Sequence, residues 1–167
     1  MSYASFDLAS LTELDFGTPG RVYRSPMPFS SQDPGQHLFQ SCQAKGISAV
    51  VVLAEADECA WETGRDLLAF YREQGLLVIH CPIVDFQTPN WQSFDRALHT
   101  VVARAKAGEN TAVHCYAGIG RTGMFMACLA HALLEKDGKE SIAWVRQYIR
   151  GAVEKEAQRQ FVEEYCT

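Results

Sequence analysis

The sequence has 167 residues, the usual length of one globular domain, and its 47% hydrophobic and 21% charged residues are ordinary for a water-soluble chain. The formal net charge of −5 comes without a basic run, which argues against a nucleic-acid or membrane-surface partner. No apolar stretch is long enough to span a bilayer, and the first ten residues lack the pattern of a secretion signal. We therefore expect one domain over residues 1–167, cytoplasmic and with a monomer favoured.

The elements expected along the chain alternate short apolar strands with helices, after a weakly patterned N-terminal extension over residues 1–20. Such alternation is typical of a mostly parallel sheet covered by helices on both faces. The last third is helical, and its first helix is apolar nearly all round, so we expect it to be buried. The fold class is thus α/β, a single domain with a short central sheet. In chain order we predict strand 21–24, helix 37–44, strand 49–53, helix 58–74, strand 76–80, helix 91–107, strand 111–114 and helices 121–136, 139–150 and 154–165.

The ten residues HCYAGIGRTG, 114–123, join the last predicted strand to this buried helix. A strand, a glycine-rich loop and a helix start form a geometry that binds anions, because the amide N–H groups and the helix dipole face the ligand. The same stretch fits the dinucleotide pattern G-x-G-x-x-G, with Glu135 or Asp137 as the ribose acid. Only helices follow it, however, and the dinucleotide fold needs a second strand there. The P-loop of nucleotide hydrolases is excluded because the G-K-[ST] step is missing.

Cys115 and Arg121 are the informative pair within this loop. A thiol at a helix N-terminus, surrounded by N–H donors, is ionised far more readily than a free one. Five intervening residues suffice for one loop around a tetrahedral anion, and the guanidinium fork of Arg121 is able to hold two of its oxygens. The spacing therefore indicates a nucleophile directed at phosphorus. The alternatives are a buried inert cysteine beside a turn and, for Thr122, a helix N-cap.

The whole stretch resembles the signature loop of the cysteine-dependent protein tyrosine phosphatase superfamily: His-Cys, five residues, Arg, Ser/Thr. The resemblance implies that Cys115 forms a phosphocysteine, that Arg121 carries the phosphate charge and that Thr122 hydrogen-bonds the sulfur. His114 is expected to fix the loop by hydrogen bonds to its backbone. The chemistry needs neither a metal nor another cofactor. The implied phosphate-binding residues are Tyr116, Ala117, Gly118, Ile119, Gly120 and Arg121.

The proton donor for the leaving group should be a carboxylic acid near this loop. Asp85 follows strand 76–80 at the same edge of the sheet, and PIVDFQTP resembles the family's acid loop, with Phe86 as a lid residue. The alternative for Asp85 is a turn-forming role. Three rival acids follow strand 49–53, and they are more simply interpreted as N-cap and first-turn residues of the next helix. These rivals are Glu55, Asp57 and Glu58.

The sequence alone leaves two further questions open, the position of Gln158 and the redox role of the cysteines. Gln158 lies in a segment that resembles the family's water-positioning glutamine segment, but it equally fits an exposed helix position. The cysteines lack any C-x-x-C pair, so we expect reduced thiols and no zinc site. The alternative is a reversible disulfide between Cys115 and Cys59 or Cys81 under oxidant.

The short chain is similar to the dual-specificity branch, whose members accept phosphoserine and phosphothreonine besides phosphotyrosine. The expected partner is a phosphorylated protein or peptide. The uncharged Tyr116 and Ile119 disfavour highly phosphorylated inositols, and the acidic net charge gives RNA caps no support. The alternatives are a phosphatase for another phosphomonoester such as a phospholipid, an inactive phosphate-reading module, and sulfur transfer or arsenate reduction.

Overall fold

A five-stranded sheet forms the centre of the computed structural model, which describes residues 7–167. The strand order is β1-β2-β5-β3-β4. All pairs are parallel except β1–β2, which is antiparallel. The mostly parallel α/β architecture that the sequence predicts is thus confirmed. The strands are β1 (Thr12–Leu14), β2 (Val22–Ser25), β3 (Ile47–Val52), β4 (Leu77–His80) and β5 (Asn110–His114).

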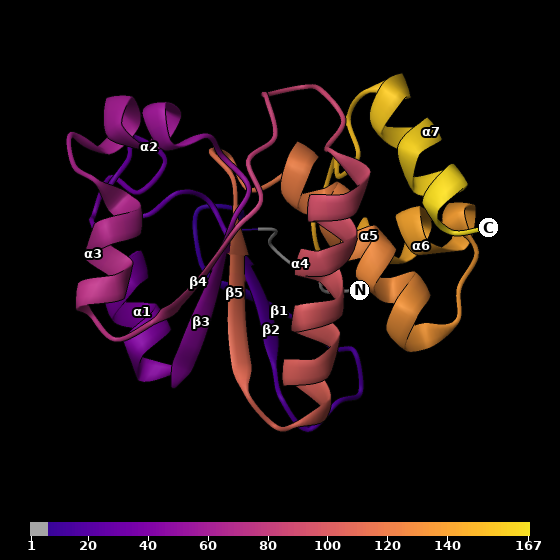
Figure 1. The fold of residues 1–167 in the computed structure, drawn as a ribbon, viewed down its shortest axis with the longest axis horizontal. Helices are drawn as coiled ribbons and strands as arrows, with labels where there is room; N and C mark the ends of the chain where they lie inside the picture. The colour runs from indigo at the N-terminus through magenta and orange to yellow at the C-terminus, as the bar shows by residue number, and fades with distance from the viewer. Residues whose placement is uncertain (1–6) are drawn as a thin grey trace.

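The helices cover both faces of the sheet, as expected, with α1, α2 and α3 on one side and the others on the opposite side (Figure 1). In the part of the chain that the structure describes, no helix is long and apolar enough to cross a membrane. The helices are α1 (Leu38–Ala44), α2 (Ala56–Thr63), α3 (Leu67–Glu73), α4 (Trp91–Lys106), α5 (Gly120–Leu134), α6 (Gly138–Val145) and α7 (Glu156–Tyr165).

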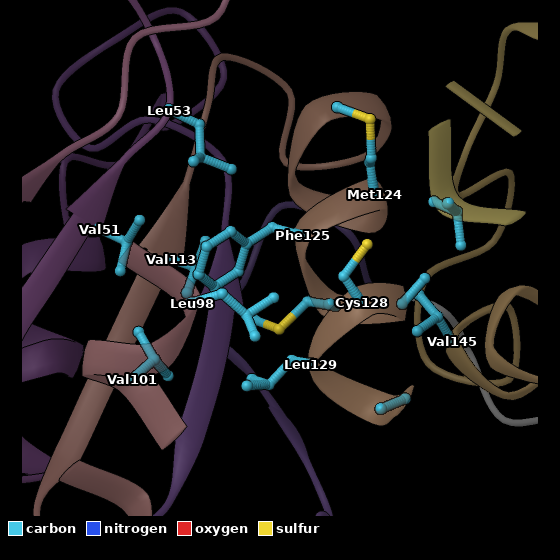
Figure 2. Close-up of a cluster of buried hydrophobic side chains, with 14 of the residues drawn as sticks. Val51, Leu53, Leu98, Val101, Val113, Met124, Phe125, Cys128, Leu129 and Val145 are labelled. Atoms are coloured by element: carbon cyan, nitrogen blue, oxygen red, sulfur yellow. The ribbon is translucent and has the colours of Figure 1, made fainter. Parts of the chain in front are cut away.

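The first helix of the C-terminal third, α5, is buried between the sheet and the other helices, as its all-round apolar sequence predicts. Its side chains from Arg121 to Ala130 are all buried. Figure 2 shows Phe125 and Leu129 of α5 beside Leu98 of α4 and Val113 of β5. Because α5 is held on every side, the position of its first turn, next to Cys115, is fixed by the core.

Three predictions about the elements need correction. The single helix 58–74 is two helices, because Gly64 ends α2 in the left-handed region at φ +70° and Asp66 caps α3 by accepting from the Ala69 N–H. The helix predicted over 139–150 ends at Val145, and residues 146–150 form turns instead. Of the expected N-terminal extension, residues 1–6 lie outside the described residues, and the rest contains the unpredicted strand β1. Leu14 and Phe16 are buried in the core, so this segment is part of the domain.

Candidate active site

The loop of residues 115–121, called the phosphate loop below, runs from the end of β5 into the first turn of α5. Cys115 is 3% exposed, and within the described part of the chain its sulfur accepts two hydrogen bonds. The Gly118 N–H donates to Sγ at 3.3 Å, and the Thr122 hydroxyl donates at 3.1 Å. Both donors stabilise negative charge on the sulfur. The predicted strand–loop–helix geometry and the predicted contact of Thr122 with the sulfur are therefore present in the structure.

Gly118 is required at its position by both space and backbone conformation. Its φ of +74° lies in the left-handed region, which disfavours a side chain. A Cβ atom there would collide with the Arg24 guanidinium and the Ser25 carbonyl. The glycine thus permits the close approach of β2 to the back of the phosphate loop.

Arg121 is held by a carboxylate that the sequence did not identify as its partner. Glu58 of α2 accepts from Nη1 at 2.7 Å and from Nη2 at 2.8 Å, and the Ile83 carbonyl accepts from Nη1 at 3.0 Å. Burial lowers the pKa of Arg121, but the hydrogen bond to Glu58 and the charges of Cys115, Glu58 and Asp85 raise it above its ordinary value. Nε of Arg121 is buried without a hydrogen-bond partner among residues 7–167.

Asp85 lies on the loop between β4 and α4, as predicted, and its carboxylate is 3.3 Å from Nη2 of Arg121. Its side chain is 47% exposed, so it reaches the phosphate loop from the solvent side. The next residue, Phe86, has φ +64° and is half exposed, with Nζ of Lys155 4.8 Å from its ring centre. Of the three rival acids, Glu55 is the N-cap residue of α2 and Asp57 lies in its first turn, while only Glu58 contacts the site.

His114 is buried below the phosphate loop and is neutral at physiological pH. Burial lowers its pKa to about 4. Its Nδ1 is 2.9 Å from the Cys115 carbonyl and its Nε2 is 2.8 Å from the Tyr71 hydroxyl. In a neutral ring Nδ1–H therefore donates to the carbonyl, and Nε2 accepts from Tyr71. The expected hydrogen bond from His114 to the loop backbone is present, while Tyr71 of α3 carried no signal in the sequence.

Gln158, in the first turn of α7, is fully buried, so the exposed position that the sequence allowed is wrong. Its Oε1 accepts from the Lys155 N–H at 3.4 Å, and its Nε2 has no partner in the described part of the chain. A Cβ atom on Gly120 would lie 3.4 Å from both polar atoms of the amide. The structure therefore brings Gln158 against the phosphate loop.

The cysteines named as redox candidates are both free and buried. Burial, with a smaller contribution from Glu58, raises the pKa of Cys59 to about 12, and burial raises the pKa of Cys81. Both are thus protonated thiols at neutral pH, and protonated thiols react slowly with oxidants.

The phosphate loop and residues Asp85 and Phe86 of the β4–α4 connection line one cavity of about 370 Å³. Its walls include the Tyr116 ring, whose hydroxyl is 2.6 Å from Ser31 Oγ, and the carboxylate-bearing Glu154, which sequence reasoning missed. A cysteine thiol, a guanidinium and two carboxyl groups thus share a space of the size of a small organic phosphate. The lining residues are Asp85, Phe86, Cys115, Tyr116, Ala117, Ile119, Gly120, Arg121 and Glu154.

This fold and this loop define the class of the protein, the cysteine-dependent phosphatases of the protein tyrosine and dual-specificity type. Residues 27–134, more than half of the chain, match the family model described as "Polymorphic toxin system, DSP-PTPase phosphatase". The chain therefore belongs to this family of DSP-PTPase phosphatases.

Relatives and solved structures agree with this assignment. The chain is 30% identical over 90 residues to cyclin-dependent kinase inhibitor 3 of Rattus norvegicus, in a match that covers 54% of this chain and only 42% of that relative. Tk-PTP in its active form is 28% identical, with a TM-score of 0.74 over 88% of this chain and 92% of that one. Kinase associated phosphatase, at 22% identity, has the same fold, with a TM-score of 0.79 over 93% of this chain and 92% of that one.

Proposed function

We propose that the protein hydrolyses phosphate monoesters of phosphorylated proteins or peptides, mainly on tyrosine and with serine and threonine accepted, through a phosphocysteine intermediate. One observation carries the proposal. The Cys115 sulfur accepts hydrogen bonds from Gly118 and Thr122 in the wall of a cavity that Arg121 and Asp85 also line. These are the parts that phosphoryl transfer without a metal requires: a stabilised nucleophile, a fixed cation and a proton donor.

In the first step the phosphate group lies on the amide N–H groups of the phosphate loop and accepts from Nε of Arg121. The Cys115 thiolate attacks phosphorus, and the bond from phosphorus to the ester oxygen breaks with its electron pair on oxygen. Asp85 donates a proton to that oxygen, so the product leaves as an alcohol or phenol.

In the second step water attacks the phosphorus of the phosphocysteine, and the Asp85 carboxylate accepts a proton from it. The phosphorus–sulfur bond breaks, inorganic phosphate leaves, and the sulfur recovers its electron pair. The Thr122 hydroxyl, 3.1 Å from Sγ, stabilises the departing thiolate. The buried Gln158 amide, whose Nε2 is unpartnered among residues 7–167, orients the water.

The walls of the cavity support an aromatic or small phosphomonoester over a highly phosphorylated inositol. Tyr116, Ile119 and Phe86 supply apolar surface for a phenyl ring, while the loop carries no lysine. Glu154 adds a negative group to the wall, which repels a second phosphate. We also propose that the protein acts in the cytoplasm, since its six free cysteines suit a reducing compartment.

The test is phosphate release from para-nitrophenyl phosphate and from phosphotyrosine, phosphoserine, phosphothreonine and phosphoinositide substrates at matched concentrations. Cys115→Ser should abolish release, whereas Cys42→Ala, at a buried cysteine on the other face of the sheet, should retain it. No release above the Cys115→Ser background would instead make the protein a phosphate-reading module. Preferred turnover of phosphoinositides, or of thiosulfate or arsenate, would likewise contradict the proposal.

A further inference from the structure

Arg24 is a fully buried arginine in the middle of β2, behind the phosphate loop. Among residues 7–167, all hydrogen bonds of its guanidinium group go to backbone carbonyls. Nη2 donates to Ala117 and Gly118, each at 3.0 Å, and Nε donates to Gly118 at 3.1 Å. Nη1 donates to Leu8 at 2.8 Å and to Ser10 at 3.2 Å.

The charge of Arg24 has no carboxylate partner within ion-pair distance among residues 7–167. Burial lowers its pKa to about 10, against the raising influence of Cys115 first and Asp7 second. Arg24 is therefore still a cation at neutral pH, and the group of opposite charge that acts on it most strongly is the sulfur of Cys115. Because a buried unpaired charge is costly, its presence at this point indicates a role beyond packing.

The geometry of the peptide units shows what this cation does to the loop. In a trans peptide the C=O and the N–H point in opposite directions. Arg24 binds the carbonyl of Ala117, and the N–H of the same peptide unit, that of Gly118, donates to Cys115 Sγ at 3.3 Å. Arg24 likewise binds the Gly118 carbonyl, so the Ile119 N–H of the next unit points away from Arg24.

We propose that Arg24 is a positioning residue of the phosphate loop, which turns two peptide units so that their N–H groups face the anion site and adds a fixed positive charge behind the Cys115 thiolate. The role of the loop in catalysis rests on the proposed function, but the effect on the sulfur does not. Gly118 fits this assignment, because a Cβ atom there would displace the guanidinium.

Other polar and charged groups lie near the same sulfur, and the test must distinguish the effect of Arg24 from theirs. Thr122 and Arg121 come from α5, and Arg121 is itself neutralised by Glu58 and Asp85. His114 of β5 is neutral because burial lowers its pKa to about 4. Asp7 raises the pKa of Arg24 and is left unchanged in every variant.

The variants for the test are Arg24→Met, which removes the charge, and Arg24→Lys, which keeps it with fewer donors. Arg104→Met is the matched control, because Arg104 of α4 also makes several contacts to distant parts of the fold, at Thr111, Ser48 and Glu109, but none to the phosphate loop among residues 7–167. The first readout is the rate of Cys115 alkylation by iodoacetamide at pH 6 relative to pH 9, which needs no substrate. The second is kcat for para-nitrophenyl phosphate, and thermal unfolding reports folding.

For Arg24→Met we expect the pH 6 to pH 9 alkylation ratio to fall by about tenfold, with Arg24→Lys between it and the wild type. We expect kcat of Arg24→Met to fall by about 10²-fold, because the loop donors are misplaced. Arg104→Met should lower only the unfolding temperature. If Arg24→Met does not fold, the alkylation ratio of Arg24→Lys alone tests the proposal. A folded Arg24 variant with the alkylation ratio of Arg104→Met would overturn the proposal. A changed ratio in a protein without phosphatase activity would leave it standing while the proposed function fails.

Discussion

Replacement of Glu58 by glutamine tests how Arg121 is oriented. The carboxylate accepts from both terminal nitrogens of the fork, at 2.7 and 2.8 Å, and its side chain is 20% exposed while that of Arg121 is 1% exposed. Glutamine keeps one acceptor and turns an NH₂ group toward the other nitrogen, so one charge-assisted hydrogen bond is lost. Hydrogen bonds to charged groups contribute about 1.5–3 kcal/mol. Because Glu58 is partly exposed and water screens its charge, we expect the lost bond to contribute an amount near the lower end of this range.

A loss of about 1.5–2 kcal/mol corresponds to roughly a 10- to 30-fold fall in kcat/KM, since about 1.4 kcal/mol is tenfold. The assay is initial-rate kinetics with para-nitrophenyl phosphate and a phosphotyrosine peptide, with competition by inorganic phosphate. Asp57→Asn, at an exposed acid one residue earlier in α2, is the matched control and should match the wild type. A kcat/KM of Glu58→Gln within twofold of that control would refute the reasoning. A raised kcat/KM would show that Glu58 competes with the phosphate for Arg121.

Three further outcomes are expected. Asp85→Asn should slow turnover of substrates with poor leaving groups by about 10²-fold and phenols with low pKa values far less, as a plot of rate against leaving-group basicity would show; a uniform effect would remove Asp85 as the acid. Because burial lowers the pKa of His114 to about 4, the unfolded chain takes up its proton first as pH falls. The contribution of neutral His114 to the free energy of unfolding is therefore fully present above about pH 6.5, and up to about 3 kcal/mol of it should be lost as the pH falls to 4, as measured by urea titrations. The His114→Gln variant should not show this pH-dependent loss. Gly118→Ala should lose most activity and destabilise the fold by more than Gly64→Ala, which has a similar φ of +70° but no neighbour within 4 Å; equal effects in urea unfolding would mean that the backbone conformation alone matters.

The sequence by itself was sufficient for the phosphate loop because that geometry is local. A strand, five loop residues and a helix start are contiguous in the chain, so the spacing of Cys115, Gly118 and Arg121 already fixes which groups can surround one anion. The position of Asp85 beside this loop was predictable for a related reason, since the carboxyl ends of parallel strands meet at one edge of the sheet. The alternation of apolar strands and helices likewise sufficed for the fold class.

Only the tertiary structure decided which distant side chains support that loop. Glu58, Arg24 and Tyr71 lie 63, 94 and 43 positions from their partners in the site, and no local pattern distinguishes them from ordinary surface acids, strand residues or core aromatics. The break at Gly64 and the pairing of β1 with β2 also depend on packing that single-sequence periodicity does not contain. Local spacing determines which groups can form an anion site, whereas the folded core determines which buried charges orient it, because burial and long-range contact exist only once the chain is folded.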